Sequence, residues 1–302
     1  METPKVSIVI ASHNCASVIV QCLSALEGQA GREMAEVIVA DSSSDETAAL
    51  IQDHFPDVRL LHFSNLMTVP ELRGAAIAAA QGEIIAILDP YCIVDGEWIT
   101  ELLRVHAERP EPAIGGAVEL ESAHCQSLVR WATYLCEYDA FMPPLEAGPA
   151  AELTGNNISY KRVALGEAEE LSYTGFWKTF VNWQLRAGGH QLWTDPLLVV
   201  KLRKPIPFME FFRSRYQHGR CFAAMRVSGA PRYIRWLRAL TAPLLPYLAL
   251  WRQARSTWPK RRHRVKSLMA APLVFLLFSS WAWGEMWGYL RGQGGSCARL
   301  FY

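Results

Sequence analysis

The feature of this sequence that most restricts its fold is the alternation of short apolar runs and helix-like segments over its first hundred residues. The apolar runs are rich in β-branched residues, as expected of strands buried on both faces. Helical patterns separate them, including one at 16–27 that stops at Gly28 and one at 70–82 that opens with proline. Such spacing predicts βαβ units, and hence an α/β fold with a mainly parallel sheet sandwiched by helices. The four predicted strands lie at 6–12, 36–41, 58–63 and 83–89.

A local signal predicts where one further helix begins, and the pattern becomes less regular later in the chain. Ser43 and Glu46 have the spacing of a capping box, so we expect them to open the helix that follows the second strand. Between 96 and 200 the pattern weakens. It predicts helices near 97–108, 125–138 and 176–187, and a strand near 113–120.

The charge distribution divides the chain. Residues 1–200 contain 27 acidic and 11 basic residues, whereas residues 201–302 contain 2 acidic and 19 basic residues. The two parts therefore carry about −16 and +17 charges, which indicates a tail that works near a polyanion. We expect a domain at 1–205 followed by a basic, aromatic-rich helical tail at 206–302.

Two uncharged runs in this tail indicate contact with a membrane. The first, 239–251, has 13 residues and is too short to span a bilayer as a helix, and the second, 268–284, has 17 and is at the lower limit. The basic stretch 259–266 lies between them, and tryptophan and tyrosine flank both runs, as at a membrane interface. We expect an anionic membrane surface as partner, bound peripherally or through one spanning or re-entrant segment. The alternative is a soluble subdomain with two core helices. Nucleic acid is not expected, because the basic residues are interleaved with long apolar runs.

The cysteines and the N-terminus favour the cytoplasmic side of the cell membrane. Seven cysteines are scattered without a C-x-x-C pair, which favours reduced, structural thiols. The first residues lack the pattern of a secretory signal.

Polar residues follow the predicted strands at the sheet edge where open α/β sheets bind ligands. They are Ser12-His13-Asn14, Asp41 and Asp89. The glycine-rich fingerprints of dinucleotide sites and P-loops are absent from the sequence. Acidic strand ends suit contacts with ribose or base, and a hard cation that bridges phosphates.

The chain resembles glycosyltransferase family 2, whose members are nucleotide-sugar transferases of the GT-A fold. The resemblance rests on VSIVIASHN, EVIVADSSSDET, ILDPYC, TGNNISYKR and WQLRAGGHQL, and on Arg73 and Trp98, and covers about 4–205. It implies inverting transfer of a sugar from a nucleoside diphosphate sugar, usually with Mg²⁺ or Mn²⁺.

The resemblance also implies roles for individual residues. Asp41 would hydrogen-bond the base, Arg73 would face the nucleotide sugar, and Asp89 would place metal and diphosphate. Without the resemblance, Arg73 would be read as a solvated helix residue. The residues that it assigns to the nucleotide sugar are Ser12, His13, Asn14, Asp41, Arg73, Asp89 and Tyr91, and those on the acceptor side are Gly155, Asn156, Asn157 and Trp177.

Two positions depart from the family pattern. Tyr91 stands where the second acid of the Asp-x-Asp element is expected, and a neutral phenol is a poor ligand for Mg²⁺ or Mn²⁺. One carboxylate and the phosphates of the substrate can still hold Mg²⁺, so metal binding at Asp89 stays open. Lys178 stands where the family carries its catalytic base, and a lysine must be neutral to take a proton. The alternative bases are Glu169 and Glu170, so the catalytic base stays unassigned.

Two functions of different classes are consistent with these residues. The first is a glycosyltransferase acting at the membrane on a lipid-linked or other glycan acceptor of the cell envelope. The second is a catalytically impaired GT-A domain that serves as a nucleotide-sugar-binding or scaffold protein, which Tyr91 and Lys178 would explain.

Overall fold

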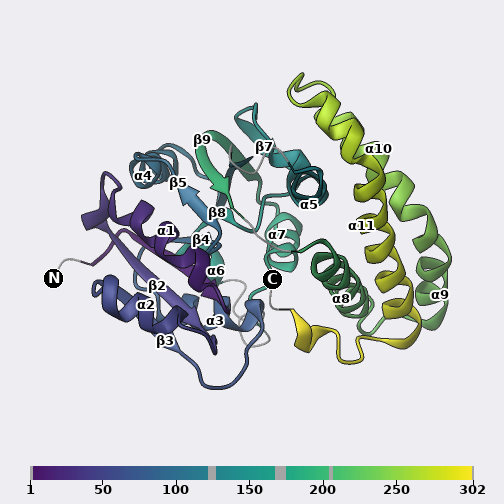
Figure 1. The fold of residues 1–302 in the computed structure, drawn as a ribbon, viewed down its shortest axis with the longest axis horizontal. Coiled ribbons are helices and arrows are strands. Elements are labelled where there is room, and N and C mark those ends of the chain that lie inside the picture. Colours follow the sequence, from purple (N-terminus) through teal and green to yellow (C-terminus); the bar gives the residue numbers. More distant parts are fainter. Residues whose placement is uncertain (1–2, 122–126, 167–174, 204–206, 301–302) are drawn as a thin grey trace. The chain divides into compact units, whose positions relative to one another are not determined.

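The computed structural model describes residues 3–121, 127–166, 175–203 and 207–300 (Figure 1). The chain divides into two compact units. Unit 1 consists of Met1–Glu119 and Phe141–Lys204, and unit 2 of Leu120–Ala140 and Pro205–Tyr302. The segment 120–140 lies inside the first domain expected from the sequence, yet its contacts belong to the C-terminal unit.

Four parallel strands form the first half of the sheet in unit 1. They are β1 (Val6–Ser12), β2 (Ala35–Asp41), β3 (Val58–His62) and β4 (Ile84–Leu88), in the order β3-β2-β1-β4. The side chains of β1 and β2 are buried on both faces of the sheet, which explains their continuous apolar sequences. The register pairs Ser12 with Asp41 and Asp41 with His62, so these three residues meet at one edge.

The later strands make the sheet mixed. β8 (Asn157–Lys161) pairs antiparallel with β4 and with β6 (Ala113–Leu120). β9 (Leu192–Leu202) pairs antiparallel with β5 (Cys92–Val94) and β7 (Gly148–Ala150). The α/β prediction is confirmed, but the sheet is mixed and not mainly parallel, because the strands after β4 pair antiparallel.

The helices of unit 1 are α1 (Ala16–Glu27), α2 (Thr47–His54), α3 (Val69–Ala79), α4 (Trp98–Glu108), α6 (Arg162–Gly166) and α7 (Lys178–Ala187), with a short 3₁₀ turn at Arg32–Met34. The first three connect the parallel strands as βαβ units require. A second 3₁₀ turn, Asp139–Phe141, spans the point in the chain where unit 2 ends and unit 1 resumes. α3 packs Leu72 and Ala76 onto one face of the parallel strands. That packing carries Arg73 toward the end of β4.

The helix after β2 begins differently from the capping box expected at Ser43 and Glu46. α2 starts at Thr47, whose backbone N and Oγ1 both donate to Asp45 Oδ1, at 3.0 and 2.5 Å. Ser43 Oγ instead donates to Asp41 Oδ1 at 2.5 Å. The capping-box prediction is wrong because the Ser43 hydroxyl donates to the buried carboxylate of Asp41 and does not cap the helix.

Unit 2 is helical. Its elements are α5 (Leu128–Tyr138), α8 (Phe208–Arg226), α9 (Arg232–Thr241), η5 (Ala242–Leu244), α10 (Leu245–Thr257), α11 (Arg264–Arg291) and η6 (Cys297–Arg299). α11 contacts all four other α-helices of the unit, with α8 on one side of it and α9 on the other (Figure 1). Within the described part of the chain, α11 is the one helix long and apolar enough to cross a membrane.

A disulfide joins Cys221 in α8 to Cys297 after α11. The expectation of reduced thiols is therefore wrong for this pair. Its members lie 76 residues apart and meet only through the packing of α8 on α11. The other described cysteines are free and buried, as expected for structural thiols: Cys15, Cys22, Cys92 and Cys136. Cys125 lies outside the described residues.

Candidate active site

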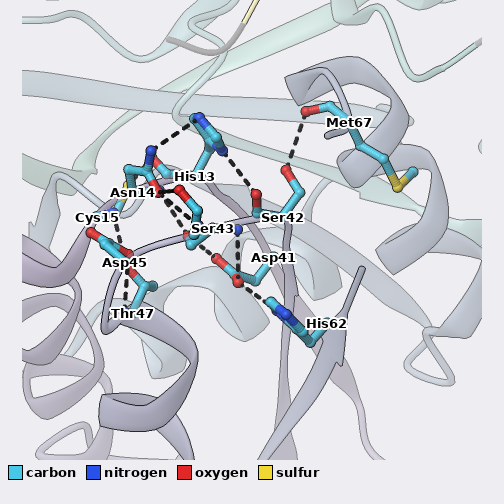
Figure 2. Close-up of polar contacts among 11 residues, drawn as sticks. His13, Asn14, Cys15, Asp41, Ser42, Ser43, Asp45, Thr47, His62 and Met67 are labelled. Atoms are coloured by element: carbon cyan, nitrogen blue, oxygen red, sulfur yellow. Dashed lines mark hydrogen bonds and ion pairs between the residues drawn. The ribbon is translucent and has the colours of Figure 1, made fainter. Parts of the chain in front are cut away.

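Asp41 is the fully buried end of β2 and is held by two neighbours. Ser43 donates to it from its backbone N at 3.1 Å and from Oγ, and His62 Nδ1 lies 2.9 Å from Oδ2 (Figure 2). Both oxygens of the predicted base-binding carboxylate are thus occupied within the protein. Sequence reasoning missed His62, which meets Asp41 through the register of β3 on β2.

The turn after β1 is tied to the turn after β2. His13 Nδ1 lies 3.1 Å from the carbonyl oxygen of Ser42, and the backbone N of Asn14 donates to Ser43 Oγ at 2.7 Å (Figure 2). Asn14 Oδ1 accepts from the backbone N of Ser44 at 2.9 Å. Asn14 has φ of 49°, a left-handed conformation that asparagine tolerates well, so it serves as a turn former.

Tyr91 lies near the start of α1. Cys15 Sγ donates to Tyr91 Oη at 3.9 Å, and the backbone N of Cys15 donates to Thr47 Oγ1 at 2.9 Å. Burial raises the pKa of Cys15, so this thiol stays protonated at neutral pH. Ser12, just before this turn, is buried.

Arg73, Asp89 and Gly155 form the contact that joins the predicted donor and acceptor sides. Arg73 Nη2 donates to Asp89 Oδ1 at 2.7 Å and to the carbonyl oxygen of Gly155 at 3.0 Å. The Arg73 and Asp89 side chains are 12% and 17% exposed, so solvent screens the ion pair only weakly. Arg73 is therefore a fixed residue of the site and not a solvated helix residue.

Asp89 fits a divalent cation through one of its oxygens. Oδ1 is used by Arg73, whereas Oδ2 has no hydrogen-bond partner among the described residues. One carboxylate with substrate phosphates is a normal ligand set for Mg²⁺. In the described ranges, no three His, Cys, Asp or Glu residues gather as a metal site of their own. The carboxylate of Asp95, six residues on, pairs with Lys201 at 2.6 Å.

The two asparagines of the TGNNIS turn are buried and bonded within unit 1. Asn157 Nδ2 donates to the carbonyl oxygens of Ala117 and Leu198 at 2.9 and 2.8 Å, and its Oδ1 accepts from Trp98 Nε1 at 3.1 Å. Asn156 Oδ1 accepts from Thr154 Oγ1 at 2.5 Å. These bonds fix the backbone that carries Gly155.

Lys178 is the first residue of α7, and its side chain lies beside Gly155. Its Nζ donates to the carbonyl oxygen of Leu153 at 2.5 Å and lies 4.0 Å from Glu152 Oε2. Burial lowers the pKa of Lys178, the charge of Glu152 opposes that shift, and the charge of Arg73 adds to it. A Cβ at Gly155 would lie 3.8 Å from both Arg73 Nη1 and Lys178 Cε, so the two cations approach the same glycine.

Glu152 and Trp177 lie next to Lys178 on the predicted acceptor side. Glu152 was missed by sequence reasoning, and no local pattern marks it. Its Oε1 accepts from Trp183 Nε1 at 2.9 Å. Trp177 precedes α7, with its ring edge-on to Phe180 at 6.2 Å between centroids. Glu169 and Glu170, the alternative bases, lie outside the described residues.

The strand ends that carry Ser12, Asp41 and Asp89 lie in a segment that matches a known protein family. Residues 7–126 match the model of the family described as glycosyl transferase family 2. The chain carries a family 2 glycosyltransferase domain. The match contains Ser12 to Asn14, Asp41, Arg73, Asp89 and Tyr91, whereas Gly155 to Lys178 lie beyond it.

Two curated relatives resemble parts of the chain. EpsH of Bacillus subtilis (strain 168), named as a candidate glycosyltransferase, is 27% identical over 117 residues, which are 38% of this chain and 34% of EpsH. The succinoglycan biosynthesis protein ExoO of Rhizobium meliloti (strain 1021) is 37% identical over 90 residues, 29% of this chain and 26% of ExoO. The chain thus matches about a third or less of each relative's length.

Solved structures confirm the GT-A fold of the family 2 glycosyltransferase domain. The mannosyltransferase PcManGT from Pyrobaculum calidifontis, solved with GDP-Man and Mn²⁺, is 18% identical with a TM-score of 0.55, over 91% of this chain and 86% of that one. Residues 1–349 of TarS from S. aureus are 12% identical with a TM-score of 0.51, over 96% and 92% of the two chains. At identities of 18% and 12%, the similarity to these two structures establishes the fold alone.

Proposed function

We propose that this protein is an inverting glycosyltransferase that uses a nucleoside diphosphate sugar. The observation that carries the proposal is the buried contact of Arg73 with Asp89 and Gly155 at the carboxyl edge of a family 2 domain. It brings a strand-end carboxylate and a guanidinium together where an open α/β sheet binds its ligand. PcManGT, which shares the fold, is described with GDP-Man.

In the proposed reaction, an acceptor hydroxyl oxygen forms a bond to the anomeric carbon while the bond from that carbon to the diphosphate oxygen breaks. The nucleoside diphosphate leaves with the electron pair, and the hydroxyl proton passes to a base. Arg73 would stabilise the negative charge that develops on the leaving diphosphate. Lys178 is the described residue best placed to take the proton, because burial favours its neutral form.

Asp89 would hold Mg²⁺ or Mn²⁺ through its Oδ2. Such a cation would neutralise diphosphate charge, and Tyr91 would leave more of its coordination to the phosphates of the substrate and to water. PcManGT is described with Mn²⁺.

The proposed acceptor is a lipid-linked or other glycan of the cell envelope, met at the cytoplasmic side of the membrane. ExoO is named for succinoglycan biosynthesis, which favours a polysaccharide product. The basic, aromatic sequence of residues 201–302 favours an anionic membrane surface.

The second candidate function is a nucleotide-sugar-binding or scaffold protein without turnover. It is favoured by Tyr91 at the second acid position and by Lys178 at the position of the base. Both departures would weaken transfer while leaving the residues around Asp41 and Arg73 able to hold a nucleotide sugar.

One experiment separates the two functions. Purified full-length protein is incubated with a panel of nucleoside diphosphate sugars, membrane-extracted acceptors and either Mg²⁺, Mn²⁺ or chelator, and release of nucleoside diphosphate is measured. Cation-dependent release supports the transferase. Saturable donor binding by calorimetry without release across the panel supports the scaffold, and absence of donor binding overturns both.

A further inference from the structure

Unit 2 exposes most of the large apolar side chains on the described surface. Of 18 such exposed residues in the described ranges, 15 belong to unit 2. Exposed apolar residues gathered on one unit mark a surface that contacts a membrane or another protein.

Six of them form one stripe along the helical segment α9–η5–α10. They recur every three or four residues, which is the spacing of one helix face. The six are Tyr233, Leu237, Leu240, Leu244, Tyr247 and Trp251, and each is 56–73% exposed. The opposite face has the complementary set, which is buried against the rest of the unit: Ala239, Ala242, Pro246, Gln253 and Thr257. The segment is thus amphipathic by position, with its apolar stripe turned outward.

The charges around this stripe identify the surface it fits. Residues 231–284 contain ten Lys and Arg residues and no Asp or Glu. Two arginines lie over tryptophan rings: Arg255 over Trp251 at 5.5 Å and Arg264 over Trp258 at 4.7 Å. Tryptophan and arginine together suit the boundary between head groups and acyl chains, where both amphipathic side chains keep a polar end in water. The uniform positive sign selects an anionic bilayer.

The packing of α11 opposes a transmembrane role for that helix. A Cβ at Gly284 would lie 2.2 Å from the carbonyl oxygen of Tyr216, and one at Gly288 would lie 2.4 Å from that of Arg220. The glycines therefore let α11 and α8 touch through their backbones. Ser280 Oγ also donates to the carbonyl oxygen of Phe212 at 2.7 Å. α11 cannot enter a bilayer without α8.

α8 is unsuited to hydrocarbon. It carries several arginines, and Arg215 lies over the ring of Trp281 at 4.3 Å, beside the uncharged run of α11. Arg215 also pairs with Glu137 of α5 at 3.1 Å. A spanning α11 would draw these charges into the membrane core, which is strongly unfavourable. α11 lies between α8 and α9–α10 (Figure 1), although Leu268, Met269, Leu276 and Trp283 of its apolar run are exposed.

We propose that α9–η5–α10 is an in-plane membrane anchor. Its apolar stripe enters the head-group boundary of an anionic bilayer, the flanking arginines contact lipid phosphates, and α11 stays outside the hydrocarbon as the central helix of the unit. The proposal deepens, and rests on, the membrane association proposed above.

The test measures binding of the full-length protein to vesicles of phosphatidylcholine with about 30% phosphatidylglycerol, by co-sedimentation. The double variant Leu240→Glu/Leu244→Glu is expected to bind at least about tenfold more weakly than wild type, because it puts two carboxylates into the apolar stripe. The matched control Leu197→Glu/Val163→Glu alters two equally exposed residues of unit 1 and is expected to bind as wild type. Circular dichroism and melting temperature should be unchanged in both variants, since all four side chains are exposed.

Extraction distinguishes the in-plane anchor from a span. Wild-type protein in native membranes is expected to be released by alkaline carbonate, and retention after carbonate would overturn the proposal. Wild-type binding by the Leu240/Leu244 variant would also overturn it. Absence of vesicle binding together with concentration-dependent dimerisation would mean that another protein surface covers the stripe. None of these outcomes affects nucleoside diphosphate release by the purified protein, so the proposed reaction is judged separately.

Discussion

Arg73 is the side chain through which the two predicted sides of the site meet. Its Nη2 bonds both Asp89 and Gly155, so Arg73→Ala removes the guanidinium and leaves a weakly screened carboxylate unpaired. We expect kcat/KM for nucleoside diphosphate release to fall about 10²-fold. Arg73→Lys should recover only part of the loss, because lysine cannot reproduce the planar fork. Arg59→Ala, which removes an arginine bonded to Ala79 away from this edge, should leave the rate unchanged. Equal rates for Arg73→Ala and wild type would contradict the assignment.

Lys178 offers a second prediction at this scale, based on the direction of its pKa. Burial lowers that pKa, so the neutral amine becomes populated at a lower pH than in an exposed lysine. If the amine takes the acceptor proton, kcat should rise with pH until Lys178 is deprotonated and then level off. Lys178→Met should lower kcat about 10²-fold or more with little change in KM, and should abolish this limb of the pH profile.

The variant Lys178→Arg distinguishes a catalytic base at position 178 from a permanent positive charge at that position. Arginine keeps the charge and cannot lose its proton, so a variant as active as wild type would show that position 178 acts as a cation. Lys5→Met is the control, because Lys5 is an exposed lysine paired with Glu83.

At the scale of the elements, α4 and β8 are joined by a buried histidine whose titration should be visible in stability. His106 Nε2 lies 2.7 Å from Ser159 Oγ, and burial, together with the charge of Lys161, lowers the pKa of His106 to about 3. The histidine of the unfolded chain therefore binds a proton near pH 6.5, whereas His106 in the folded protein stays neutral until the pH approaches about 3. Its contribution to stability is full above about pH 6.5 and is lost as the pH falls toward about 3.

Urea unfolding at pH 7 and pH 5 measures this contribution. Wild type should lose about 2 kcal/mol more unfolding free energy between these pH values than His106→Gln, which has no titrating ring. The two proteins should show parallel pH dependence above pH 7. Parallel curves down to pH 5 would mean that His106 accepts its proton in the folded state.

The extent to which this fold could be predicted depends on how local each signal is. The β-branched runs and helix stops are local, so the strands β1 to β4 and the place of Asp89 at the sheet edge follow from sequence and the edge rule for α/β sheets. Arg73 was placed at the site only by the family resemblance. The partner of Asp41 could not be fixed that way, because His62 meets it only through the register of β3 on β2. The disulfide of Cys221 with Cys297 likewise depends on helix packing across 76 residues.

Asn157 shows the same limit within the site. The TGNNIS turn was assigned to the acceptor side by resemblance, and the assignment of Gly155 to Trp177 stays a prediction. The three buried bonds of the Asn157 amide arise from strands and a helix that are distant in sequence. No local pattern separates an asparagine that binds substrate from one that locks a sheet.

At the scale of the whole molecule, the opposite charges of the two parts of the sequence bear on how the protein meets a membrane. Residues 201–302 carry about +17 charges, and the stripe on α9–η5–α10 adds apolar area, so binding should have an electrostatic and a hydrophobic part. Raising NaCl from about 0.1 M to about 1 M shortens the Debye length from about 10 Å to about 3 Å and screens the first part only.

We therefore expect binding to vesicles with about 30% phosphatidylglycerol to weaken about tenfold or more over this salt range and then to reach a plateau. The plateau should equal the binding to pure phosphatidylcholine, because insertion of the aromatic stripe does not depend on lipid charge. Leu240→Glu/Leu244→Glu should lower the plateau and leave the salt-dependent part largely intact. Co-sedimentation across the salt series measures both parts. Complete release of the wild type at high salt would show that charge alone holds the protein and that the stripe stays out of the bilayer.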